Sequence, residues 1–160
     1  MQVYACIPYQ NDGIKRALKQ LKYRGSRDIA SALAELLADA LKKNPRDTEI
    51  VAIPTTAARR HERGFNQAEL LGRALAAQLN LPFADALVKI RETPPQSTLK
   101  RNERLKNLRG AFAARGDHIP QKTVIIVDDI STTGATLIEA ARALKKSGAQ
   151  TVIGAVVAHS

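Results

Sequence analysis

Apolar runs without polar alternation occur at two places in the middle and late parts of this chain. Ile50–Ile53 and Thr123–Val127 consist almost wholly of β-branched and aliphatic residues, and such a strand is typically covered on both faces, as in a parallel sheet. Further segments with apolar positions, at Val3–Ile7, Phe83–Arg91 and Thr151–Ala158, predict three more strands. The pattern indicates an α/β fold with a mostly parallel, twisted sheet.

Between these runs, apolar residues recur at the spacing of an amphipathic helix. Ile14, Leu18 and Leu21 predict a helix that stops at Gly25, and a second helix is predicted from Ser26 to just before Asn44-Pro45. Two further helices are predicted, one capped by Asn66 that runs to Leu79, and one from Thr136 to Ser147. These helices are expected to flank the sheet.

The remaining segments are polar and predict loops. Thr55–Gln67 follows the strand at Ile50–Ile53 and carries three arginines. Pro94–Asn107 is rich in Lys and Arg and is interpreted as a flexible flap, partly helical from Thr98, because a long polar loop in a compact domain is usually functional or mobile. Leu108–Gln121 is interpreted as a connection whose Ala111-Phe112-Ala113 packs locally.

Composition limits the class of protein. The chain has 160 residues, of which 44% are hydrophobic, enough for one sizeable core. No apolar run is long enough to cross a bilayer and no signal-peptide pattern follows Met1, so we expect a cytoplasmic protein without membrane insertion. Cys6 is the only cysteine, which excludes disulfides within the chain and thiolate-clustered zinc sites, and the three histidines are scattered.

The strongest chemical signal follows the strand at Thr123–Val127. Asp128 and Asp129 are adjacent carboxylates, which can accept hydrogen bonds from two vicinal hydroxyls or lie near a divalent cation. The hydroxyls, the glycine and the backbone N–H groups of the next turn, at the start of a helix, suit a phosphate. A phosphorylated ribose offers both features. The plainer interpretation is a buried strand, an acidic turn and a Thr-capped helix.

The loop after Ile53 is expected to face the same crevice, because ligands of doubly wound sheets bind outside the carboxyl ends of the strands. We expect this loop to bind a pyrophosphate through backbone donors and guanidinium groups. The residues predicted for this role are Thr55, Thr56, Arg59, Arg60 and Arg63.

The formal net charge of +10 is concentrated in clusters. One cluster lies in the first predicted helix, one in the loop after Ile53, and one between Lys89 and Arg109. Two interpretations stay open: the cations solvate helix faces, or they form a track for a nucleic acid. With three Tyr, three Phe and no Trp, the chain is poorly supplied for a base-stacking platform.

Three separated segments, together with the Asp128–Thr136 signature, resemble one family. They are Lys22-Tyr23-Arg24-Gly25, then Glu62-Arg63-Gly64-Phe65-Asn66-Gln67 with the residues after it, then Arg91-Glu92-Thr93 through Arg109-Gly110-Ala111-Phe112. In this order they resemble the ComF/GntX phosphoribosyltransferase-like proteins, over nearly all of the chain. The four-cysteine zinc module with which full-length members usually start is not represented, so no zinc is expected here.

The resemblance implies a type I phosphoribosyltransferase-like fold in a single domain, 1–160, with a hood-like N-terminal segment, 1–30, and a flexible loop, 92–108. It implies 5-phosphoribosyl-1-pyrophosphate (PRPP) and magnesium as ligands, and a role in DNA uptake during natural transformation. Asp128 and Asp129 would hold the ribose as the catalytic pair, with magnesium bound directly or through the ligand. The 5-phosphate would lie on Ser131, Thr132, Thr133, Gly134, Ala135 and Thr136, and the loop residues Lys100, Arg101 and Arg104 would close over the site.

Different activities remain open at this stage. One is transfer of a phosphoribosyl group to an unidentified acceptor. Another is a non-catalytic, PRPP-sensing module that binds single-stranded DNA or a competence helicase, and a third is a transcriptional regulator on the same fold. The residues proposed for nucleic-acid contact are Lys19, Lys22, Arg24, Lys100, Arg101 and Arg104.

Overall fold

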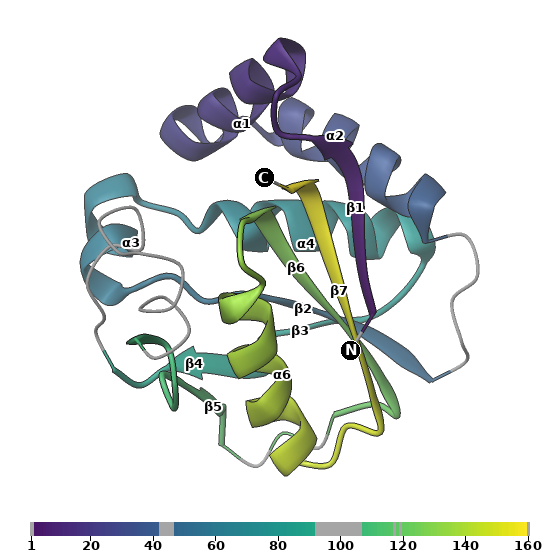
Figure 1. The fold of residues 1–160 in the computed structure, drawn as a ribbon, viewed down its shortest axis with the longest axis vertical. Helices are drawn as coiled ribbons and strands as arrows, with labels where there is room; N and C mark the ends of the chain where they lie inside the picture. Colours follow the sequence, from purple (N-terminus) through teal and green to yellow (C-terminus); the bar gives the residue numbers. More distant parts are fainter. Residues whose placement is uncertain (1, 42–46, 92–106, 117, 119, 160) are drawn as a thin grey trace.

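The structure, a computed structural model, describes residues 2–41, 47–91, 107–116, 118 and 120–159. Along the chain the elements are β1 (Gln2–Pro8), α1 (Asp12–Arg24), α2 (Arg27–Ala40), β2 (Thr48–Ala52), α3 (Ala57–Arg63), α4 (Gln67–Leu79), β3 (Phe83–Ala84), β4 (Leu87–Lys89), β5 (Phe112–Ala114), β6 (Thr123–Ser131), α6 (Ala135–Lys146) and β7 (Thr151–His159) (Figure 1). The flap predicted at 94–107 falls outside the described residues except at Asn107, and Lys100, Arg101 and Arg104 fall outside them too.

The main sheet has five parallel strands in the order β1-β7-β6-β2-β3. A second, two-stranded antiparallel sheet pairs β4 with β5. The predicted α/β fold with a mostly parallel sheet is therefore confirmed.

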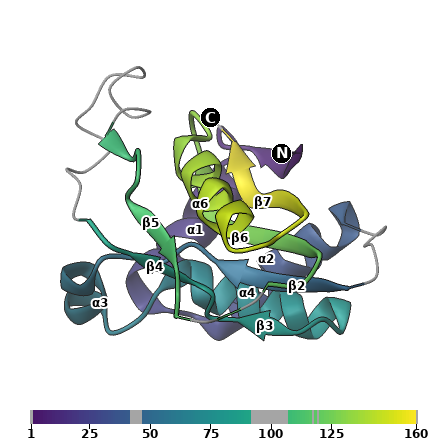
Figure 2. The same ribbon diagram turned by 90° about the horizontal axis from the view of Figure 1, so that it is seen from below.

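The central strand β6 explains why the sheet has helices on both sides. Val124, Ile125, Ile126 and Val127 are all fully buried, and successive side chains point to opposite faces. Val124 and Ile126 pack in the core that α6 covers, and Ile125 and Val127 pack in the core under α1, α2 and α4. Figure 2 shows α6 on one side of the sheet and α2 and α4 on the other.

The order of the strands reverses between β2 and β6. From β2 the chain passes through α4 to β3 on one side, and from β6 it passes through α6 to β7 on the other. The segments that follow β2 and β6 therefore diverge at the carboxyl edge of the sheet, where open α/β sheets bind ligands.

The structure corrects the prediction of a loop over Thr55–Gln67. Ala57–Arg63 forms the helix α3, which starts at Thr56, whose Oγ1 accepts from the Arg59 N–H at 3.3 Å, and ends at Gly64 with φ of 77°. Caps rather than burial define this helix, because none of its residues is buried.

Three further segments differ from their predictions. Phe83–Arg91 is two strands, because the chain leaves the main sheet after Ala84 and Leu87–Lys89 joins the second sheet. The predicted connection Leu108–Gln121 contains β5, which pairs with β4. In addition, β6 continues past Val127 to Ser131, so the acidic pair belongs to the strand rather than to a turn after it.

Two of the segments that carry the family resemblance meet in space. Gly25 ends α1 in the left-handed conformation with φ of 59°, and the ring of Phe65 lies against it. A Cβ added at Gly25 would lie 2.9 Å from the ring. The Gly25–Phe65 contact therefore sets how the N-terminal helix α1 sits against the segment between α3 and α4.

Among the described residues, no helix combines the length and the apolar character needed to cross a membrane.

Gly25→Ala is expected to destabilise the fold by more than the roughly 1–2 kcal/mol that a side chain costs in the left-handed conformation, because the new methyl group would also meet Phe65. Gly64→Ala is the matched control, since Gly64 also ends a helix at positive φ but has nothing within 4 Å of an added Cβ. Urea unfolding measures both variants. Phe65→Leu in the Gly25→Ala background should recover the excess loss, and equal losses in the two alanine variants would contradict the contact.

Candidate functional site

A cleft of about 990 Å³ lies where the strand order reverses. Figure 1 shows α1 above the carboxyl ends of β6 and β7, with α3 to one side. The cleft is lined by α1, by the segment from Ile53 to Ala68, and by the ends of β6 and α6. Of the residues predicted for the site, those that line it are Thr55, Thr56, Arg59, Arg63, Asp128, Asp129, Thr132, Thr136, Lys19 and Lys22.

The acidic pair occupies the part of β6 that extends beyond its neighbour β2. The β2–β6 pairing ends at Ala52 and Val127, whereas β6 stays paired with β7 through Ser131. Asp128 and Asp129 thus lie beyond the end of the β2–β6 pairing, and both residues line the cleft.

Backbone hydrogen bonds fix both carboxylates. Oδ1 of Asp128 accepts from the Asp129 N–H at 2.9 Å, and Oδ1 of Asp129 accepts from the Ile130 N–H at 2.9 Å. Burial raises the pKa of Asp128 well above its ordinary value, and the neighbouring Asp129 carboxylate raises it further. The charged form of Asp128 is therefore disfavoured, and nearby hydroxyl donors or a cation would stabilise it.

The turn after β6 leads directly into α6. Gly134 precedes the helix with φ of 73°, and no side chain caps the helix at that position. Oγ1 of Thr133 accepts weakly from the Ala135 N–H at 3.4 Å. Thr132 and Thr136 line the cleft, whereas Ser131 and Ala135 are buried. A backbone turn at a helix start, with two threonines toward the cleft, suits an anionic group.

The arginines of helix α3 border two different pockets. Arg59 and Arg63 line the cleft. Arg60 does not, because its guanidinium pairs with Glu69 at 3.1 Å and borders a smaller pocket of about 210 Å³. The predicted pyrophosphate set is therefore brought together on the cleft apart from Arg60.

Asn66 ties this basic segment to the end of β2. Its Nδ2 donates to the Ile53 carbonyl at 3.0 Å, and its Oδ1 accepts from the Ala68 N–H at 3.1 Å, where α4 begins. The side chain is buried. One amide thus caps α4 and holds the returning chain beside the strand that it left.

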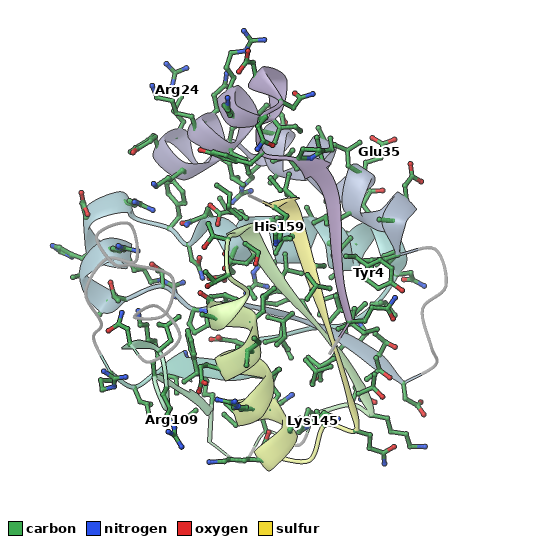
Figure 3. All side chains as sticks on the ribbon, in the orientation of Figure 1. Tyr4, Arg24, Glu35, Arg109, Lys145 and His159 are labelled. Atoms are coloured by element: carbon green, nitrogen blue, oxygen red, sulfur yellow. The ribbon has the colours of Figure 1, made fainter. Side chains whose placement is uncertain are left out.

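The N-terminal helix supplies cleft residues that the sequence analysis did not assign to the site. Lys15, together with Lys19 and Lys22, lines the cleft from one face of α1, and Tyr9 and Tyr23 line it as well. The spacing of the three lysines was the available signal, because residues three and four apart share a helix face. Arg24 does not line the cleft, and Figure 3 shows it projecting outward from the end of α1.

The charges of the cleft favour a ligand with both anionic groups and hydroxyl donors. Six basic side chains line it, namely Lys15, Lys19, Lys22, Arg59, Arg63 and Lys89, beside the two carboxylates. Among the residues that the structure describes, no three His, Cys, Asp or Glu side chains gather to hold a metal ion. Two carboxylates alone fit a magnesium ion that takes most of its oxygen ligands from water and bound phosphates.

Comparisons with known proteins agree with this geometry. The model of the phosphoribosyl transferase domain matches residues 65–160. A "DNA utilization protein" of Salmonella typhi is 36% identical in an alignment of length 144 that covers 83% of this chain and 61% of the relative. "Competence protein F" of Haemophilus influenzae is 32% identical in an alignment of length 144 that covers 84% of this chain and 63% of that protein.

The chain therefore spans less than two thirds of the length of these relatives. A purine phosphoribosyltransferase from Pyrococcus horikoshii, whose structure is solved, is 18% identical, with a TM-score of 0.34 over 100% of this chain and 89% of that one. At that score, the fold assignment rests on the domain model and on the sheet topology.

Asp128→Asn is expected to raise thermal stability at neutral pH, because the raised pKa means that the folded state disfavours the charged carboxylate. The stabilising effect should be present above the pKa of Asp128 in the folded protein. It should fade as the pH falls through that pKa, where the wild-type carboxyl takes up its proton. Melting temperatures of both proteins across a pH series measure the difference, and a variant that is less stable at neutral pH would contradict the sign.

Proposed function

Because this chain belongs to the phosphoribosyl transferase domain family, we propose that its cleft binds PRPP together with magnesium. The observation that carries the proposal is the convergence of Asp128 and Asp129, Thr132 and Thr136, and the arginines of α3 on one cleft at the point where the strand order reverses. These groups match, in turn, the diol, the 5-phosphate and the pyrophosphate of one molecule.

Each group has a stated task in this proposal. The carboxylates of Asp128 and Asp129 accept hydrogen bonds from the ribose 2- and 3-hydroxyls. The turn at Thr132–Thr136 holds the 5-phosphate at the start of α6. Arg59 and Arg63 contact the pyrophosphate, and magnesium neutralises the charge on its oxygens. The proposed roles of Ser131, Thr133, Gly134 and Ala135 are to shape the backbone of the turn.

The same arrangement supports phosphoribosyl transfer to an acceptor. Breaking the bond between C1 of the ribose and the pyrophosphate places positive charge on the sugar and negative charge on the leaving oxygens. In this proposal the carboxylates contact the sugar and the guanidinium groups contact the leaving oxygens. What supports this step is that acidic and basic side chains line the same cleft. Lys100, Arg101 and Arg104 lie outside the described residues, so their closure over the site stays a prediction.

Asp128→Ala/Asp129→Ala should lower the affinity for PRPP–magnesium at least tenfold, because a hydrogen bond to a charged group contributes about 1.5–3 kcal/mol and two carboxylates are removed. Isothermal titration calorimetry measures the affinity. Asp28→Ala is the matched control, since Asp28 is an exposed carboxylate in the first turn of α2, away from the cleft, and should leave binding unchanged. If the double variant and the wild type bind PRPP–magnesium with equal affinity, the proposal is refuted.

A second candidate function is binding of single-stranded DNA. One observation favours it: Lys15, Lys19 and Lys22 line the cleft from one face of α1, in addition to the arginines proposed for the pyrophosphate, and of the three Lys15 also pairs with Asp12 at 3.1 Å. The names of the relatives, "DNA utilization protein" and "Competence protein F", agree with a role of this family in DNA uptake. In this candidate function the chain senses PRPP and contacts DNA, or a helicase on DNA, through α1.

Lys19→Gln/Lys22→Gln should weaken binding of an oligothymidylate and lower the magnitude of the slope of log K against log salt by about 1.4, because each phosphate neutralised on a single strand contributes about 0.7. Fluorescence anisotropy at several salt concentrations measures the slope. Lys145→Gln/Lys146→Gln removes the same charge from the last turn of α6, and Figure 3 shows Lys145 at the end of the molecule away from α1. Equal slopes for the two variants would exclude α1 as the contact.

A further inference from the structure

The helix α3 divides its side chains between the main cleft and the smaller pocket. Ala58, Arg59 and Arg63 line the cleft, whereas Ala57 and Arg60 line the smaller pocket. Successive residues of an α-helix lie about 100° apart around its axis. A rotation of α3 by the angle of one residue would therefore put Arg60 in the place of Arg59. The rotation of this helix decides which guanidinium groups face a ligand in the cleft.

Apolar packing does not set this rotation. No residue of α3 is buried, and the caps at Thr56 and Gly64 fix where the helix begins and ends. A helix of seven residues is too short to be stable by itself. Its orientation therefore depends on contacts of its polar side chains. On the cleft side, the Arg63 guanidinium donates to Oε1 of Gln67 at 3.4 Å, which is long for a hydrogen bond.

On the side of the smaller pocket, Glu69 ties α3 to α4. Its Oε2 accepts from the Arg60 guanidinium at 3.1 Å, and its Oε1 accepts from Nε and Nη2 of Arg73 at 3.1 and 2.9 Å. The Arg73 guanidinium lies 4.4 Å from the centroid of the Phe83 ring, and a Cβ added at Gly72 would be 3.0 Å from that ring. One carboxylate thus connects the exposed helix to α4 and to β3.

These contacts form a network, which is the case in which ion pairs near a surface have a measurable effect. Each oxygen of Glu69 accepts from a different arginine, and one of these arginines also stacks on an aromatic ring. The side chain of Glu69 is 24% exposed, so solvent screens the two pairs less than it would at full exposure.

We propose that Glu69 is a positioning residue for the pyrophosphate contacts: it holds Arg60 at the smaller pocket and thereby keeps Arg59 and Arg63 turned to the cleft. The inference rests on the proposed function, since it concerns the arginines assigned there to the pyrophosphate. Glu69 lines the smaller pocket and not the cleft, so its effect on a ligand passes through α3.

The test compares PRPP with ribose 5-phosphate, both with magnesium, because the two ligands differ by the pyrophosphate. In titration calorimetry, Glu69→Ala should lower the affinity for PRPP about tenfold or more, the loss expected for one hydrogen bond to a charged group. It should leave the affinity for ribose 5-phosphate unchanged. The sign is informative, since removal of a negative charge would by Coulomb attraction alone strengthen the binding of an anion.

Asp85→Ala is the matched control. Asp85 also lines the smaller pocket and pairs with an arginine, Arg115 at 3.4 Å, but this pair does not involve α3. The variant removes the same charge from the same pocket and should lower neither affinity.

Arg60→Ala removes the tie from the other end. The Glu69–Arg73 pair remains, and the Arg60 side chain is 57% exposed, so this variant tests the proposal even where Glu69→Ala does not fold. It should lower the affinity for PRPP by a similar factor. Glu69→Ala/Arg60→Ala should lower it no further, because both changes break one contact.

Other results would overturn the positioning role. Unchanged PRPP affinity in Glu69→Ala would show that the network does not orient α3, and a higher affinity would show that Arg60, once released, binds the pyrophosphate itself. Equal losses for PRPP and ribose 5-phosphate would show that Glu69 supports the fold as a whole. Failure of the proposed function gives a different result, since the wild-type protein would then bind neither ligand, and the positioning role would fall with it.

Discussion

The site depends on one mismatch in strand length. β6 continues to Ser131 while its neighbour β2 ends at Ala52, opposite Val127. The residues of β6 beyond that point keep hydrogen bonds to β7 on one side and border a cleft on the other. Because the strand order also reverses there, the chain leaves β2 and β6 in opposite directions and cannot fill the gap. Two carboxylates are thus held rigidly by a sheet and remain accessible to a ligand.

The wall across from the acids is assembled by contacts between segments distant in sequence. Asn66 bonds the Ile53 carbonyl, so the basic segment returns to the end of β2. The neighbouring Phe65 packs on Gly25, and Arg63 lies over Tyr23, so the same short segment also positions α1. A change in how α1 packs would move the arginine and the tyrosine together. The contact between Gly25 and Phe65 gives a structural role to both motifs. Without it, the motif at Gly25 would be an ordinary helix end and the motif at Phe65 an ordinary turn.

The sequence predicts the features that are encoded by adjacent residues, and it does not predict those that depend on contacts between distant residues. β6 and the acidic pair were predictable because burial on both faces gives a continuous apolar run, and because the two carboxylates are adjacent in the chain. The helix α3 was not, since none of its residues is buried and it has no apolar period. β5 was not, since its three residues pair only with the distant β4. The cleft position of Tyr23 depends on contacts with distant residues, which no local pattern encodes.

The electrostatics of the cleft narrow the kind of ligand that it would suit. Burial and the Asp129 charge keep the pKa of Asp128 raised, although six basic side chains line the same cleft. The basic side chains therefore do not offset the burial and the neighbouring charge that raise the pKa of Asp128. A simple polyanion would pair with the lysines and arginines and leave the carboxylates repelled. A cation alone would do the reverse. A phosphorylated sugar offers hydroxyl donors to the acids and phosphate oxygens to the basic groups, which is why the proposed function assigns such a ligand to the cleft.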